Sequence, residues 1–258
     1  MEYFLIAVVA FLASTVTFFS GFGLNTLLMP VFALFFSLEV AIALTAIVHI
    51  LNNTLKLGII GKYTYWKVVL YFGTPALIAS FIGAQVLVLL SQSTYLIKYT
   101  LAHKTFYITW IKLTTGFLVL FFTMMESIPK LKKIGAPLQW MPLGGVLSGF
   151  FGGLSGHQGA LRSVFLIRMN LDKHRYIATG ATIAFVIDIA RLVVYGMNTL
   201  SYNLISKHFF VLLIAVSSAF LGVIVGSSFL KKVTYQVIQR LVTVFLIVFS
   251  LCLILGIL

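Results

Sequence analysis

The chain has 258 residues, of which 61% are hydrophobic and only 9% are charged, and its mean hydropathy is +1.11. Soluble domains carry charge on about a quarter of their residues, so this composition excludes a soluble globular protein and indicates an integral membrane protein. The net charge of +13 does not indicate nucleic-acid binding, because the cations are spread over short loops between apolar runs. A single cysteine, Cys252, excludes an intramolecular disulfide and a cysteine-based metal cluster, and the sequence predicts no metal and no cofactor.

Apolar runs recur from one end of the chain to the other, and about 20 residues are needed to cross a bilayer as a helix. The first run has Glu2 in place of a basic start, so we interpret it as a mature transmembrane segment and not as a signal peptide. The sequence predicts an all-α polytopic membrane protein with segments at 3–19, 24–37, 39–61, 66–90, 106–125, 138–154, 159–170, 173–196, 204–230 and 235–257. Two of them, 24–37 and 159–170, are short and follow glycine-rich breaks, which is typical of half-helices.

The two halves of the chain match each other when the sequence is shifted by 135 residues. The shift places the letters SGFG at 20–23 over SGHQ at 155–158, Asn53 over Asp188, and Lys56 over Arg191. This match predicts an N-terminal repeat over 1–125, a cytoplasmic linker over 126–137 and a C-terminal repeat over 138–258. With about five segments each, an odd number, the second repeat is inverted relative to the first, as in many secondary transporters. Whether the first two segments of each repeat span fully or form re-entrant hairpins stays open.

The loop charges predict an orientation. Lysines and arginines gather in the loops at 62–67, 130–133, 168–175 and 231–240, whereas the opposite loops hold only Lys98, Lys104 and Lys207. Because cytoplasmic loops carry the excess of positive charge, the first group is predicted to be cytoplasmic. Both termini are then extracytoplasmic, and the protein is expected in a bacterial inner membrane.

The two glycine breaks are the first candidate binding features. Backbone that is not helical survives at membrane depth only where protein or a water-filled cavity covers it, so matched breaks in inverted repeats are expected to meet near the midplane. Half-helices that begin at such breaks direct free N–H groups and the positive end of the helix dipole at whatever lies there, which favours an anion. The candidate residues of the two breaks are Gly21, Gly23, Asn25, Gly156, His157, Gln158 and Gly159. The alternative is that these glycines only allow helices to pack closely.

Ionisable side chains inside the apolar segments are the second candidate feature, because each costs about 2.5–3.5 kcal/mol to insert at the helix centre and normally faces a cavity. His49, Asn53 and Lys56 share one face of the third segment, and Arg162 stands one turn into the second half-helix. In the eighth segment Asp188 and Arg191 are spaced to pair. Lys56, Arg162 and Arg191 are therefore expected to bind a small oxyanion, while Asp188 and His49 are candidates for charge compensation and proton coupling.

Structural explanations compete with these assignments. Lys56 and Lys112 lie near segment ends, where a lysine can extend its ammonium to the interface. Asp188 and Arg191 are also compatible with a purely structural buried pair. His49 is equally compatible with a satisfied core histidine and with a ligand.

The two break motifs, SGFGLNTLLMP at 20–30 and GFFGGLSGHQGALRSVFL at 149–166, resemble the paired glycine motifs of the sulfite exporter TauE/SafE family, also called toluene sulfonate uptake permeases. The resemblance covers nearly the whole chain. It implies an inner-membrane permease for sulfite or an organosulfonate, acting with no nucleic-acid partner and no enzymatic activity. Leu24, Asn25, Gln158 and Ala160 replace glycines of the family motif, and Phe165 stands where the first repeat has Pro30.

Two other functions remain as alternatives. A passive anion channel uses the same kind of positive vestibule, although inverted repeats with broken helices favour alternating access by a secondary-active permease. An intramembrane serine protease is suggested by the letters GLSG around Ser155. Its repetition as Ser20 and Gly21 favours a structural motif, so Ser155 is expected to act through hydrogen bonds only. The sequence predicts no oligomeric state, and it does not identify the anion, the direction of transport or the coupling ion.

Overall fold

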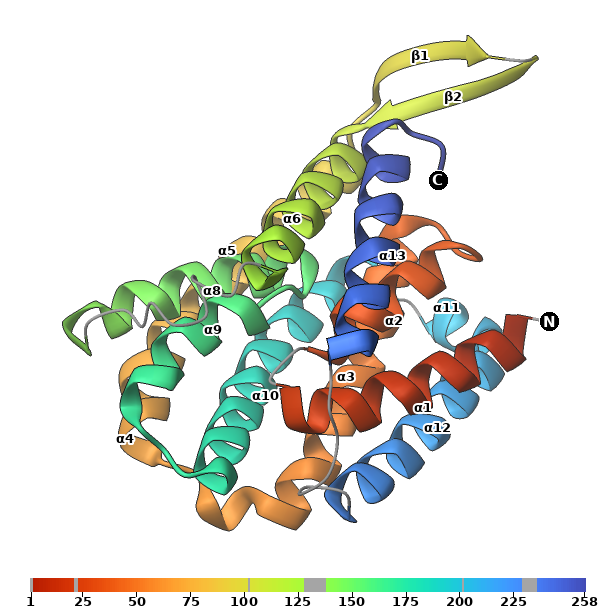
Figure 1. Cartoon of the computed structure of the whole chain (residues 1–258). Helices are drawn as coiled ribbons and strands as arrows, with labels where there is room; N and C mark the ends of the chain where they lie inside the picture. The colour runs from red at the N-terminus through yellow and green to blue at the C-terminus, as the bar shows by residue number, and fades with distance from the viewer. Residues whose placement is uncertain (1, 21–22, 102, 128–137, 201, 229–235) are drawn as a thin grey trace.

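The computed structural model describes residues 2–20, 23–101, 103–127, 138–200, 202–228 and 236–258 (Figure 1). The helices are α1 (Glu2–Ser20), α2 (Leu24–Ala33), α3 (Leu38–Ile60), α4 (Trp66–Val68), α5 (Thr74–Ser91), α6 (Trp110–Ser127), α8 (Met141–Ser155), α9 (Gly159–Leu166), α10 (Lys173–Asn198), α11 (Tyr202–Lys207), α12 (Phe209–Ser228) and α13 (Gln236–Ile254). Short 3-10 turns lie at Gly61–Tyr63, Leu138–Trp140 and Ile167–Met169, and a π turn over Val69–Gly73 joins α4 to α5. Two strands complete the list, β1 (Tyr95–Leu101) and β2 (Lys104–Thr109).

The predicted fold class, an all-α polytopic membrane protein, is confirmed. Within the described residues, four helical stretches are long and apolar enough to cross a membrane, namely Leu38–Tyr63, Trp66–Ser91, Lys173–Asn198 and Phe209–Ser228. Large apolar side chains such as Leu70, Ile78, Leu221 and Ile224 are more than half exposed. In a chain of this composition they form a surface for lipid, because lipid tails are as apolar as the protein core.

The antiparallel hairpin of β1 and β2 was not predicted, and the expectation of a helical segment from residue 106 is wrong at its start. Residues Lys104–Thr109 form β2, and α6 begins only at Trp110. The two strands are rich in Tyr, Thr, Ile and Phe, which favour extended backbone. The hairpin rests on the C-terminal end of the chain, where the Tyr99 hydroxyl donates a hydrogen bond to the Leu255 carbonyl over 2.5 Å.

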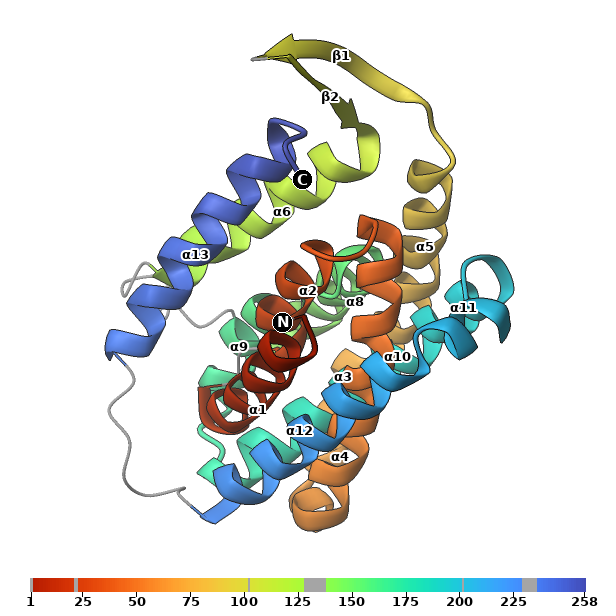
Figure 2. The same ribbon diagram turned by 90° about the vertical axis from the view of Figure 1, so that its right-hand side faces the viewer.

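Close backbone contacts join two pairs of helices, α5 with α8 and α1 with α12 (Figures 1 and 2). In the first pair a Cβ atom on Gly149 would collide with the Ala76 carbonyl, and one on Gly153 with the Ser80 carbonyl. In the second pair a Cβ atom on Gly222 would collide with the Phe11 carbonyl. Glycine is therefore needed at these positions because it lets two membrane helices approach closely. Figure 2 also shows α6 and α13 side by side.

The helices α3 and α10 meet at the centre of the molecule and run antiparallel. His49 contacts Asp188, whereas the later residue Thr64 contacts the earlier residue Thr182, with 2.9 Å between the two hydroxyls. The starts of α9 and α10 follow the starts of α2 and α3 at the same 135-residue shift that aligns the two halves of the sequence. An antiparallel α3 and α10 is what an inverted duplication requires; the complete repeat and the division at 126–137 stay predictions.

Candidate functional site

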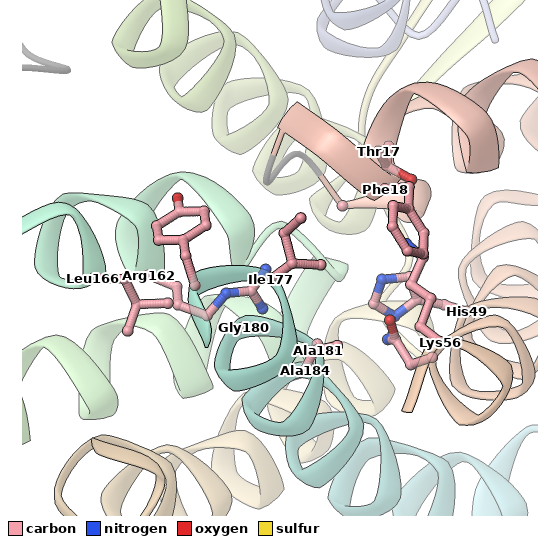
Figure 3. Close-up of a pocket in the computed structure, with 13 residues that line it drawn as sticks. Thr17, Phe18, His49, Lys56, Arg162, Leu166, Ile177, Gly180, Ala181 and Ala184 are labelled. Carbon is pink, nitrogen blue, oxygen red and sulfur yellow. The ribbon is translucent and has the colours of Figure 1, made fainter. Parts of the chain in front are cut away.

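A polar cavity lies between α1, α3, α9 and α10 and has a volume of about 450 Å³, counting its open mouth (Figure 3). Its described lining consists of Thr17, Phe18, Gly23, His49, Asn53, Lys56, Arg162, Leu166, Tyr176, Ile177, Gly180, Ala181 and Ala184. Its residues from α3 and α10 lie between the middle of each helix and the end that adjoins the turns at 61–65 and 167–172. The cavity therefore lies towards the side that the loop charges predict to be cytoplasmic.

Two cations from different helices face this cavity. Figure 3 shows Arg162 and Lys56 approaching it from opposite sides. Both side chains are buried, with exposed fractions of 7% for Arg162 and 6% for Lys56. Within the described ranges neither forms an ion pair, and Arg162 Nη1 has no hydrogen-bond partner.

Local packing explains how the two cations are held. The Lys56 ammonium lies 5.9 Å from the centroid of the Phe18 ring, a cation–π contact that holds the charge away from lipid. Arg162 crosses α10 at Gly180, where a Cβ atom would lie 3.4 Å from the guanidinium Nε. Phe18 thus positions Lys56, and the small residue Gly180 leaves room for Arg162. Neither cation forms an ion pair with a carboxylate of the described chain, although Asp188 attracts Arg162 through space.

A second polar cluster lies deeper, between α3 and α10, and it is compensated. Asp188 accepts a hydrogen bond from His49 Nδ1 over 2.5 Å and one from Asn53 Nδ2 over 3.4 Å. Arg191 Nη2 lies 2.8 Å from Asp188 Oδ1, and neither side chain is exposed. Burying a charge is costly unless it is paired, and here Asp188 pairs with Arg191.

Asn25, at the start of α2, closes this cluster on the remaining side of Arg191. In the amide orientation that matches donors with acceptors, Asn25 Oδ1 accepts from Arg191 Nη2 over 2.6 Å and from Nη1 over 2.9 Å. The Asn25 amide nitrogen then donates to the Thr45 carbonyl over 3.3 Å. Gly156 packs against this arrangement at φ +80°, where a Cβ atom would collide with the Asn25 amide. Asn25, the second residue of α2, thus contacts two residues of the second half of the chain, Gly156 and Arg191.

The break between α8 and α9 is fully enclosed by protein. Gly156 ends α8 in the left-handed conformation with its N–H bonded to the Gly152 carbonyl over 2.9 Å. The Gln158 carbonyl accepts from Ser148 Oγ and from the Arg162 N–H. His157 stacks on Phe122 with its Nε2 unpartnered, and both atoms of the Gln158 side-chain amide are also unpartnered among the described residues.

The structure separates the predicted site residues into groups. It brings Gly23, His49, Asn53, Lys56 and Arg162 to the cavity, and it places Asn25, Gly156, Asp188 and Arg191 in the compensated cluster behind it. His157, Gln158 and Gly159 belong to the enclosed break and are not among the described lining residues, so the start of α9 does not point at the cavity here. Gly21 lies outside the described residues.

Several lining residues were missed by the sequence interpretation, notably Thr17, Phe18, Tyr176 and Gly180. Only their places in the sequence could have indicated that they line the cavity. Thr17 and Phe18 lie within two turns of the first break, and Tyr176 lies in the first turn of α10. The Ser155 hydroxyl donates a hydrogen bond to the Phe151 carbonyl over 3.2 Å, and its expected role through hydrogen bonds only stays a prediction. The neighbouring His157 Nδ1 lies 3.1 Å from the Ser155 carbonyl oxygen and 3.2 Å from the hydroxyl.

Comparison with known proteins gives one family. The family model described as sulfite exporter TauE/SafE matches residues 6–253, which is nearly the whole chain. Neither the curated proteins nor the solved structures include a match to this chain. The matched region contains both glycine breaks, the cavity and the compensated cluster. The protein is a multi-pass membrane transporter that belongs to the sulfite exporter TauE/SafE family.

Proposed function

We propose that this protein is a secondary-active permease that moves a small sulfur-containing oxyanion, sulfite or an organosulfonate, with the anion bound between Lys56 and Arg162. The observation that carries the proposal is a pair of buried cations that face one cavity and form no ion pair within the described chain. A guanidinium binds an oxyanion through two parallel hydrogen bonds, and an ammonium adds a point charge. The sulfur oxyanion is inferred from the family.

The positions of the two polar layers support alternating access. The cavity is lined by the C-terminal half of α3 and the N-terminal half of α10, which adjoin the predicted cytoplasmic loops, whereas Asp188 and Arg191 lie about three turns further along α10 than Ile177. The contacts among Asn25, Gly156 and Arg191 close the path beyond the cavity. We therefore interpret this conformation as open towards the cytoplasm, with the compensated cluster as the closed gate.

His49 is the candidate for proton coupling. Its Nδ1 is bonded to Asp188, and the same ring lines the cavity that holds Lys56 and Arg162. A proton added to this ring increases the positive charge beside the anion, so anion and proton binding favour each other through Coulomb attraction. The proposal places the protein in a bacterial inner membrane with both termini outside the cytoplasm.

Anion binding to the purified protein tests the proposal. We expect sulfite, thiosulfate, sulfoacetate or taurine to raise the melting temperature, since a ligand at 100 times its Kd stabilises the native state by about 2.7 kcal/mol. Arg162→Ala should abolish the shift. Lys112→Ala is the matched control and should retain it, because Lys112 on α6 donates a hydrogen bond to the Tyr107 carbonyl of β2 and is not among the described lining residues of the cavity. A panel with no effect on well-folded protein, or an equal shift in Arg162→Ala, would contradict the proposal.

A further inference from the structure

We infer that the cavity between Lys56 and Arg162 selects doubly charged sulfur oxyanions over singly charged ones. The inference rests on the proposed function and makes its substrate class more specific. It is based on the charges of the described residues that line the cavity, most of which come from the helices α1, α3, α9 and α10.

The described cavity wall carries two strongly basic side chains and no carboxylate. Of its described lining residues only Lys56 and Arg162 are strongly basic, His49 and Tyr176 are the other titratable groups, and none is Asp or Glu. The two cations act on each other through space, which disfavours an empty cavity with both charged. A bound anion removes this repulsion in proportion to the charge it brings.

The carboxylate in the interior is already engaged. Asp188 contacts His49, Asn53 and Arg191 and is fully buried behind the cavity. It accordingly forms no ion pair with Lys56 or Arg162, as judged over the described ranges. A singly charged anion therefore compensates one of the two cavity cations and leaves the other uncompensated, whereas a doubly charged anion compensates both.

The two cations line one and the same cavity. Arg162 and Lys56 approach from opposite sides of the cavity, with Phe18 above the ammonium (Figure 3). The part of the wall that α10 contributes includes the short or apolar side chains of Ile177, Gly180, Ala181 and Ala184, which donate no hydrogen bond. The uncharged polar residues of the described lining are Thr17, Asn53 and Tyr176. We expect the oxygens of a sulfonate head to bind one cation and a second charged atom of the same ion to bind the other. A neutral methyl group in place of the second charged atom leaves that cation without a counterion.

Thiosulfate and methanesulfonate form a matched pair for the test, because both carry the same three-oxygen head and differ in a charged sulfur or a neutral methyl group. Their dissociation constants are measured by isothermal titration on the full chain, at one pH and one ionic strength. We expect thiosulfate to bind about tenfold to a hundredfold more tightly, the range for one hydrogen bond to a charged group.

Variants of the two cations assign the preference. Lys56→Gln should weaken thiosulfate binding and leave methanesulfonate binding within about twofold, so that the preference disappears, while Lys56→Arg should retain it. Arg162→Gln is the second neutralising variant and should also remove the preference. Lys112→Gln, outside the cavity, should leave both constants unchanged.

Equal affinity of the wild-type protein for the two anions would overturn the inference, as would a preference that survives both neutralising variants. If both anions bind equally and Arg162→Gln weakens both, the charge selection fails and the proposed function stands. If neither anion binds, and if the other sulfur oxyanions of the panel do not bind either, both this inference and the proposed function are contradicted.

Discussion

The buried contact between Asp188 and Arg191 is the clearest electrostatic feature at the scale of single residues. Both side chains have no exposed surface, and Asn25 and His49 occupy the remaining sides of the pair. Asp188→Asn leaves Arg191 charged and buried without a counterion, so we expect a loss of stability of about 3–5 kcal/mol. The melting temperature of the purified protein in one detergent measures it.

The double variant Asp188→Asn with Arg191→Gln is the control, because it removes the orphan charge as well as the pair. We expect it to recover most of the lost stability, since replacing both partners of a buried pair costs little compared with removing one. A double variant as unstable as Asp188→Asn would mean that the pair is not the source of the effect.

Gly156 is constrained by both its backbone and its surroundings. Its φ of +80° is unfavourable for other residues, and a Cβ atom would collide with the Asn25 amide and lie 2.7 Å from Arg191 Nη1. We expect Gly156→Ala to lose about 1–3 kcal/mol from backbone strain alone, and to reduce anion transport because Asn25 is displaced. Gly196→Ala in α10 is the matched control, with no atom within 4 Å of its added Cβ. Equal effects of the two substitutions would contradict this explanation.

The sequence predicted the ionisable residues of the site better than their grouping. His49, Lys56, Arg162, Asp188 and Arg191 stand out because charge is costly inside an apolar segment, and the spacing of the last two predicted their pairing. The sequence could not show that Arg191 is closed off from the cavity, because that depends on Asn25, 166 positions earlier, reaching the guanidinium. A contact of such long range follows from packing and has no local signal.

At the scale of elements, the contact between α5 and α8 depends on glycines of α8 lying against carbonyls of α5. Gly149 is the test position, because its Cβ would meet the Ala76 backbone. We expect Gly149→Val to separate the two helices and to cost about 1–3 kcal/mol of stability, as overpacking does in well-packed interiors. Gly58→Val on α3 is the control, with open space around its added Cβ. Equal melting temperatures for Gly149→Val and the wild-type protein would contradict this packing.

Most helix positions were predictable from the lengths of the apolar runs, and the starts of α9 and α10 follow the glycine break and Asp172. Asp172 caps α10 by accepting a hydrogen bond from the Arg175 N–H over 3.0 Å. The hairpin was not predictable in this way, since β2 ends at Thr109 and α6 begins at the next residue, Trp110, with no break in the sequence between strand and helix. Its register instead depends on pairs such as Tyr99 with Phe106 and on the contact with the C-terminal end.

At the scale of the whole molecule, the orientation in the membrane is open to a direct test. With Cys252 replaced by alanine, we expect a membrane-impermeant maleimide to label Lys98→Cys on intact cells and to label Lys62→Cys only after the membrane is opened. Both positions are exposed in the structure, so access to reagent is limited by the membrane alone. The opposite labelling pattern would invert the orientation that the loop charges predict.

Three features support a carrier: the polar cavity, its cations Lys56 and Arg162, which form no ion pair in the described ranges, and the closed layer of Asn25, Gly156 and Arg191 behind them. A channel requires a continuous path through the protein, whereas a carrier exposes its site to one side at a time. Counterflow distinguishes the two, because only a carrier exchanges an ion on one side for an ion on the other.

The most direct measurement is uptake of labelled sulfite or thiosulfate by proteoliposomes preloaded with the same unlabelled anion. We predict that preloading accelerates uptake by the wild-type protein, that Arg162→Ala abolishes uptake, and that Lys112→Ala leaves it unchanged. Uptake that is insensitive to preloading, or that persists in Arg162→Ala, would contradict a permease that binds its anion at the cavity between Lys56 and Arg162.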